Sequence, residues 1–204
     1  IAVTVKDDCL QWPSGACRDL TGDQIVPVDF IGTDYIVLRG ELEGSEKAVI
    51  FGTETNTQIY VKGVLNGTIN PGSITTINIS DAATFIKTSK PVYLMHLSGF
   101  GCQLGAPILP SIECSGYDQI SFTRSINYPF ILNIMTKAGN EDAFSLNGNQ
   151  NAIPASSFTT VPNKTDWVYA KLTFTESQIP VNTGNIIKNS KGNFQLGLIN
   201  GSSA

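Results

Sequence analysis

The sequence predicts an all-β protein built from two tandem antiparallel β-sandwich-like modules. Short stretches rich in Ile, Val, Thr and Tyr are separated by Gly, Asn, Pro and Asp at intervals of roughly ten residues, a spacing typical of sandwiches and barrels. Turn signals such as Asn66-Gly67 and Pro71-Gly72 fall between these stretches. The two helical candidates, residues 81–86 and 176–179, are short enough to be single turns within loops.

The expected strands follow one another along both halves of the chain. Residues 1–8 alternate apolar and polar side chains as a strand does. Further strands in the first half are predicted at residues 34–42, 47–54, 57–65, 73–80 and 90–99. In the second half they are predicted at residues 128–137, 142–148, 166–175 and 192–201.

The two halves resemble one another in sequence. The stretch "TFIKTSKPVYLMHLSG" (residues 84–99) is matched by "NIIKNSKGNFQLGLING" (185–201), and Tyr35-Ile36-Val37 by Phe130-Ile131-Leu132. Similarity in a fixed order predicts modules of duplicated origin. We expect a first module at residues 1–122, containing both cysteine loops, and a second at residues 123–204.

Composition excludes several classes of function. Charged residues make up 15% of the chain and the net charge is −4, so nothing favours nucleic-acid binding, which needs clustered Lys and Arg. We find no apolar run long enough to span a membrane and no signal-peptide pattern at residues 1–8. The expectation is an exported piece of a longer protein that has neighbouring domains and does not insert into a membrane.

The four cysteines fall into two close pairs, Cys9 with Cys17 and Cys102 with Cys114. Three connectivities are possible, of which the local one is the simplest. Local disulfides predict an oxidising, extracellular setting, whereas four reduced, buried thiols in a cytosolic protein are the alternative. The spacings and the presence of a single histidine, His96, disfavour a zinc or redox site.

No residue pattern predicts catalysis, and we expect the protein not to be an enzyme. His96 lies on an apolar strand, where a hydrogen-bonded wall residue is the expected role. Glu41 and Glu43 lie two residues apart and share one strand face, so a solvated edge is favoured over a pair of catalytic acids. A glycan-active enzyme using Glu41, Glu43 or Asp142 stays open as the third alternative.

Calcium is the one cofactor for which the sequence offers ligands. Asn140, Asp142, Asn147 and Asn149 carry oxygen donors close to tight turns, although their spacing matches no known calcium loop. A plain hydrophilic hairpin explains these residues equally well.

Three aromatic residues are candidate ligand anchors. Trp12 and Tyr117 lie inside or beside the cysteine loops, and Trp167 lies at the start of a predicted strand. Aromatic rings on short, rigid loops commonly bind carbohydrate or protein ligands. The alternative is that these rings fill the ends of the sandwich cores.

Four sequence stretches, taken in order, resemble a known family. They are "GTDYIV", "GTETNTQIYV", "FIKTSKPVYLMHLSGFGCQLGAPILPSIECSGYDQISFTRS" and "PFILNIMTKAGNEDAFSLNG". Together they resemble the IgG-Fc-binding-protein N-terminal domain family over about residues 30 to 150. The chain departs from the family pattern after Asp118-Gln119, where "ISFTRS" replaces "LPP". The stretch "NSKGNFQLGLING" is also similar to a run in very large surface proteins of gliding Bacteroidetes.

The resemblance implies an extracellular or cell-surface module of a large adhesin, with no catalytic residues. We therefore expect a non-catalytic adhesion or recognition module that binds a polysaccharide or glycoprotein. A purely structural stalk or spacer without a ligand is the alternative.

Overall fold

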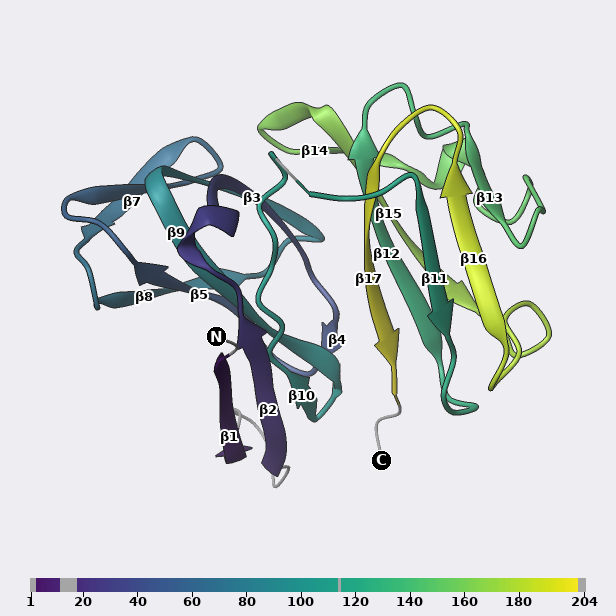
Figure 1. The fold of residues 1–204 in the computed structure, drawn as a ribbon, viewed down its shortest axis with the longest axis horizontal. Helices are drawn as coiled ribbons and strands as arrows, with labels where there is room; N and C mark the ends of the chain where they lie inside the picture. Colours follow the sequence, from purple (N-terminus) through teal and green to yellow (C-terminus); the bar gives the residue numbers. More distant parts are fainter. Residues whose placement is uncertain (1–2, 12–17, 114, 202–204) are drawn as a thin grey trace. The chain divides into compact units, whose positions relative to one another are not determined.

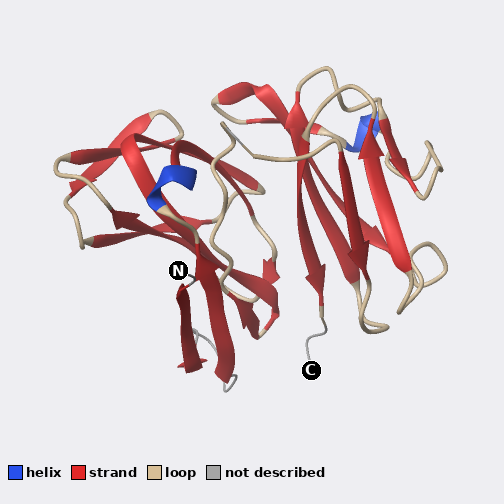
Figure 2. Ribbon diagram, in the orientation of Figure 1, coloured by secondary structure: helices blue, strands red, loops and turns tan. Residues whose placement is uncertain are grey.

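The computed structural model describes residues 3–11, 18–113 and 115–201, and it is all-β, as the sequence predicted (Figure 2). Its described residues form two compact units, one extending to residue 113 and the other covering residues 115–201. The division falls earlier in the chain than the expected boundary at residues 122/123, which lies inside a strand of the second unit. Neither of the two described helices, each a three-residue 3-10 turn, is long and apolar enough to cross a membrane.

The first unit begins with a hairpin and continues as a sheet of eight strands (Figure 1). The hairpin consists of β1 (Val3–Gln11) and β2 (Arg18–Ile25), followed by the turn η1 (Val28–Phe30). The sheet contains β3 (Gly32–Leu38), β4 (Glu41–Leu42), β5 (Glu46–Gly52), β6 (Thr57–Val61), β7 (Val64–Ile69), β8 (Ile74–Ile79), β9 (Ala83–Gly101) and β10 (Gln103–Gly105). Carboxylates of Asp19 and Asp23 on β2 accept hydrogen bonds from the N–H groups of Leu104 and Ile108, which ties the hairpin to the chain after β9.

The 19-residue strand β9 organises this sheet. It pairs antiparallel with β3, β5, β6 and β10 and parallel with β4. Residues 83–87 of β9 lie opposite β3, and residues 92–97 lie opposite β5. The helical candidate at residues 81–86 was therefore wrong, because pairing with β3 continues the strand through it.

The core of the first unit is formed by alternate residues of these strands. It contains Val37, Ile50, Ile59, Ile86 and Leu94, each at most 2% exposed. Tyr35 lies among them and donates its hydroxyl hydrogen bond to the carbonyl of Val92, at 2.6 Å. Burial raises the pKa of Tyr35 to about 12, so its hydroxyl stays neutral.

A buried contact between the side chains of Glu46 and His96 joins β5 to β9. Nε2 of His96 lies 2.9 Å from Oε2 of Glu46, and Glu46 is fully buried. The contact does not have the geometry of a well-aligned hydrogen bond. The carboxylate also accepts hydrogen bonds from the N–H groups of Gly40 and Leu42. His96 is thus a buried residue of the sheet that lies beside a carboxylate, on the apolar strand where the sequence placed it.

Burial acts to raise the pKa of Glu46, but His96 and the two N–H donors outweigh it. The pKa of Glu46 therefore lies below its ordinary value. A carboxylate whose pKa is lowered by folding stabilises the folded state above its unfolded pKa, and this contribution is lost as the pH falls through the folded pKa.

The second unit is a sandwich of two antiparallel sheets (Figure 1). One sheet contains, in spatial order, β11 (Gln119–Thr123), β16 (Gly184–Asn189) and β13 (Phe144–Leu146). The other contains β14 (Thr159–Val161), β15 (Lys164–Phe174), β12 (Phe130–Lys137) and β17 (Phe194–Asn200), and the turn η2 (Ala155–Ser157) precedes β14. Both sheets contribute side chains to one core that includes Phe122, Leu132, Phe144, Ile187 and Phe194.

Arg124 closes one end of this sandwich. It is 2% exposed and donates hydrogen bonds to the carbonyls of Ile126, Tyr128 and Ile179 and to the side chain of Asn127. Its guanidinium group also lies 5.7 Å from the centre of the Phe130 ring. These contacts hold the loop between β11 and β12, which begins with Arg124 and Ser125, the last two residues of the "ISFTRS" segment in which the chain departs from the family pattern.

The repeated sequences noted above have different backbone paths. Residues 84–99 lie within the single strand β9, whereas residues 185–201 form β16, a turn and β17. Within this segment of β9, the register of the pairing with β3 shifts between Lys87 and Val92. The duplication of modules stays a prediction.

Replacing Glu46 with Ala should lower the free energy of unfolding of the first unit by about 3 kcal/mol at neutral pH, because His96 and two backbone N–H groups lose a buried partner. Glu46→Gln keeps an acceptor and should cost less. Urea denaturation measures the difference in free energy of unfolding between wild type and Glu46→Gln. This difference should narrow as the pH falls below 4.5, the ordinary pKa of Glu. A gap independent of pH would contradict the role given to the carboxylate.

Candidate functional site

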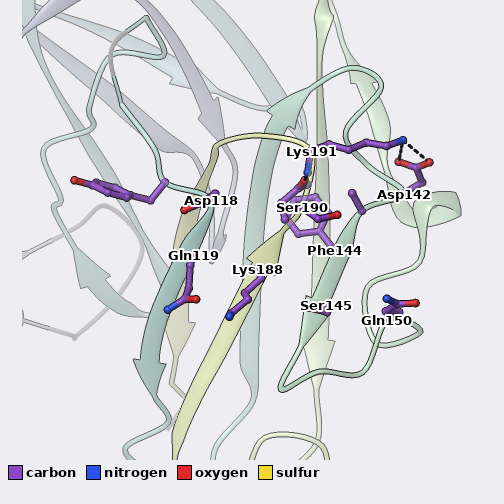
Figure 3. A pocket seen from close by; sticks show the side chains of 12 residues that line it. Asp118, Gln119, Asp142, Phe144, Ser145, Gln150, Lys188, Ser190 and Lys191 are labelled. Carbon is purple, nitrogen blue, oxygen red and sulfur yellow. Dashed lines mark hydrogen bonds and ion pairs between the residues drawn. The ribbon is translucent and has the colours of Figure 1, made fainter.

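The second unit carries a hollow of about 730 Å³ beside its three-stranded sheet (Figure 3). Three segments line it: the start of β11, β13 with the residues before and after it, and the end of β16 with the turn that follows. The lining residues are Tyr117, Asp118, Gln119, Asp142, Ala143, Phe144, Ser145, Gln150, Lys188, Asn189, Ser190 and Lys191. Its volume is within the range of ligand sites in proteins.

A polar row crosses the outer face of the sheet at this hollow. Gln119 of β11 pairs with Lys188 of β16, and Lys188 pairs with Ser145 of β13. Successive side chains of a strand point to opposite faces, and the next pair, Ile120 with Ile187, faces the core. The three polar side chains therefore lie side by side on the outer face, as Figure 3 shows.

Four polar side chains of the hollow have no partner within the described part of the chain. In residues 3–11, 18–113 and 115–201, the side chains of Gln119, Ser145, Gln150 and Lys188 make no hydrogen bond or ion pair with one another or with any other described residue. They line the hollow as donors and acceptors exposed to water.

An ion pair lies at one end of the hollow. Nζ of Lys191 is 2.6 Å from Oδ1 and 2.7 Å from Oδ2 of Asp142 (Figure 3). The hydrogen bond from Lys191 lowers the pKa of Asp142 below its ordinary value. Both side chains are about half exposed, 49% and 58%, so the pair orients the rim of the hollow more than it stabilises the fold.

Buried Asn189 connects the segments that form the rim. Its Oδ1 accepts hydrogen bonds from the N–H groups of Lys191 and Gly192, and its Nδ2 donates to the carbonyl of Asn140. Its backbone N–H donates to the carbonyl of Asp118, at 2.8 Å. One residue, 3% exposed, thus joins the turn after β16 to the turn before β13 and to the start of β11.

Tyr117 has an exposed ring on a fixed backbone. Tyr117 is 73% exposed. Its backbone N–H donates a hydrogen bond to the carbonyl of Phe194 at 3.1 Å, and its carbonyl accepts one from the N–H of Phe194 at 2.9 Å. The preceding Gly116 has φ +99°, and a Cβ there would lie 2.7 Å from the carbonyl oxygen of Phe194. Only glycine fits at this close approach of two chain segments.

The other two predicted aromatic anchors have different outcomes. Trp12 lies outside the described residues. Trp167 is only 4% exposed, and Nζ of Lys137 lies 4.9 Å from the centre of its ring. Its prediction as an exposed anchor is corrected, because the ring is buried in the second unit.

Three of the four predicted calcium ligands accept hydrogen bonds through their side-chain oxygens. The side-chain oxygens of Asp142, Asn147 and Asn149 accept hydrogen bonds from Lys191, the N–H of Ile186 and the N–H of Asn151, respectively. Asn140 contributes its carbonyl to Asn189. The described residues contain no group of three or more His, Cys, Asp or Glu that could hold a metal ion. Calcium binding stays a prediction, and these contacts are those of a hydrogen-bonded hairpin.

The described cysteines differ from each other. Cys9 is a free, exposed thiol, so the predicted Cys9–Cys17 disulfide is not formed. The hairpin register places Arg18 opposite Gln11. Cys9 lies two residues before Gln11 on β1, within the register shift between Asp7 and Leu10. Cys102 is disulfide-bonded, but Cys17 and Cys114 lie outside the described residues, so the pairing of Cys102 with Cys114 stays a prediction.

The carboxylates proposed for a glycan-active enzyme are dispersed. Glu41 and Glu43 are exposed at the short strand β4 and the turn after it, and Asp142 belongs to the other unit. Retaining and inverting glycosidases need two carboxyl groups across one cleft. These residues therefore do not support that alternative.

Replacing Asn189 with Ala should loosen the rim and lower the free energy of unfolding of the second unit by about 2 kcal/mol, because two N–H groups and one carbonyl lose a buried partner. Asn189→Asp keeps both acceptor contacts and should be milder. Hydrogen exchange of the Lys191 and Gly192 amides measures the effect. Unchanged protection of these amides in Asn189→Ala would show that the side chain does not hold the turn.

Comparison with known proteins gives one clear match. The family described as IgGFc binding protein matches residues 1–199. No match was found among curated proteins or among solved structures. The family match confirms the resemblance read from the strand and cysteine-loop motifs, and it covers both units; the link to gliding Bacteroidetes stays a prediction. The chain belongs to the IgGFc binding protein family.

Proposed function

We propose that the chain is a non-catalytic, extracellular recognition module that binds a protein or glycoprotein ligand. The observation that carries the proposal is the family match over residues 1–199, because the family takes its description from binding the Fc part of immunoglobulin G. A family name transfers a class of function more safely than a particular ligand, so Fc serves as the first ligand to test.

The geometry of the second unit supports recognition. The hollow offers unpaired polar side chains on a rigid sheet, and an ion pair and a buried amide fix its rim. Binding energy is gained most readily where the groups of a site are already ordered before the ligand arrives. Tyr117 adds an exposed aromatic ring at the edge of this surface.

We further propose that the module is part of a large, exported adhesin with neighbouring domains. The family match over residues 1–199 supports an extracellular context of this kind. A structural spacer is the second candidate, and the burial of Trp167 favours it, because a spacer needs no exposed anchor.

The full 204-residue chain should bind immobilised Fc or mucin-type glycoproteins, as measured by surface plasmon resonance. Tyr117→Ala should weaken binding severalfold, because it removes an exposed aromatic ring beside the hollow. Tyr128→Ala is the matched control, since Tyr128 is also exposed, at 49%, in the same unit but does not line the hollow. Absence of binding to every glycoprotein tested would favour the spacer.

A further inference from the structure

We propose that the hollow beside β11, β16 and β13 binds a neutral saccharide, presented as the glycan of a glycoprotein ligand. This inference rests on the proposed function and deepens it by naming the surface and the chemistry of the bound group.

The spacing of the polar row suits a sugar. Gln119, Lys188 and Ser145 lie on neighbouring strands, and such strands are about 4.8 Å apart. A carboxamide, an ammonium group and a hydroxyl therefore form a line in which each group can reach a different hydroxyl of one or two sugar rings. A carboxamide both donates and accepts hydrogen bonds, as a sugar hydroxyl does.

The availability of these groups also favours a polar ligand. The three side chains have no partners among the described residues, so a ligand displaces only water from them. Gln150, from the turn after β13, extends the same surface and is equally unpaired within the described part of the chain (Figure 3). A hydroxyl-rich ligand can replace the lost water contacts, whereas an apolar ligand would leave these groups unsatisfied.

The charges lining the hollow balance, which favours a neutral ligand. Asp142 and Lys191 neutralise each other, and Asp118 and Lys188 contribute one charge of each sign. A polyanion such as a sulfated glycan or a nucleic acid would gain little from this balance and would meet two carboxylates.

The rim of the hollow is ordered without a ligand. Asn189 holds the turn that carries Lys191, and Ser190 N–H donates to the carbonyl of Ala143 at 3.1 Å. The exposed ring of Tyr117 provides apolar surface for the C–H groups of a sugar at the edge of the polar row. Together these features give a site with polar contacts at its floor and a fixed boundary.

The test compares the double variant Gln119→Ala/Lys188→Ala with Ser121→Ala in the full chain. Ser121 faces outward on β11, as Gln119 does, but does not line the hollow. Each chain is titrated against a panel of neutral oligosaccharides, and against Fc with its N-linked glycan intact or enzymatically removed. Circular dichroism verifies that each variant is folded.

We expect the double variant Gln119→Ala/Lys188→Ala to lose at least tenfold in affinity for the intact glycoprotein or for an oligosaccharide, with Ser121→Ala unchanged. Removal of the glycan should have the same effect as the double variant. Binding to free oligosaccharide alone would assign the site to polysaccharide instead of a glycoprotein glycan.

Two results separate failure of this inference from failure of the proposed function. Glycoprotein binding that survives both glycan removal and the double variant would overturn the saccharide site and leave recognition intact. Absence of binding to all probes would overturn both. Selective binding of sulfated oligosaccharides over neutral ones would contradict the argument from charge balance.

Discussion

The arrangement of the candidate site depends on the hydrogen bonds of one buried amide, that of Asn189. Its side chain and backbone join three chain segments that are distant in sequence: the start of β11, the turn before β13 and the turn after β16. Without these bonds the exposed Asp142–Lys191 pair would have little to fix it, because pairs exposed to solvent contribute little free energy by themselves. The shape of the hollow is therefore set by a buried group that a ligand need not touch.

In both units, buried polar groups stabilise the fold, and exposed polar groups are those that a ligand can reach. In the first unit Glu46 is fully buried beside His96, and its carboxylate accepts hydrogen bonds from two backbone N–H groups. In the second unit Arg124 is buried against carbonyl groups. These buried charged groups thus stabilise the fold, and the groups available to a ligand at the hollow are amides, a hydroxyl and a lysine.

Alternation of apolar and polar residues predicted the fold class well, because one face of each strand must be buried. The helical candidate at residues 81–86 was wrong because pairing with β3 overrides a weak local preference, and Trp167, expected as a ligand anchor at the start of a strand, is buried. In "DQISF" the alternation does identify Gln119 as outward-facing. In "NIIKN" it does not identify Lys188, because Asn185 and Asn189 are buried while Ile186 is exposed. It does not reveal that β11 and β16 are neighbours, since strand order is set by long-range contacts, and so this part of the site could not be predicted.

The central claim is that the outer face of the β11–β16–β13 sheet is the surface that meets a ligand. The direct test is chemical-shift mapping of the ¹⁵N-labelled chain. The chain is titrated with the glycan released from a glycoprotein that it binds. The account predicts that the shifted backbone amides cluster at Gln119, Ser145 and Lys188 and at the turn of residues 190–192. Shifts confined to the first unit, with these amides unmoved at saturation, would contradict it.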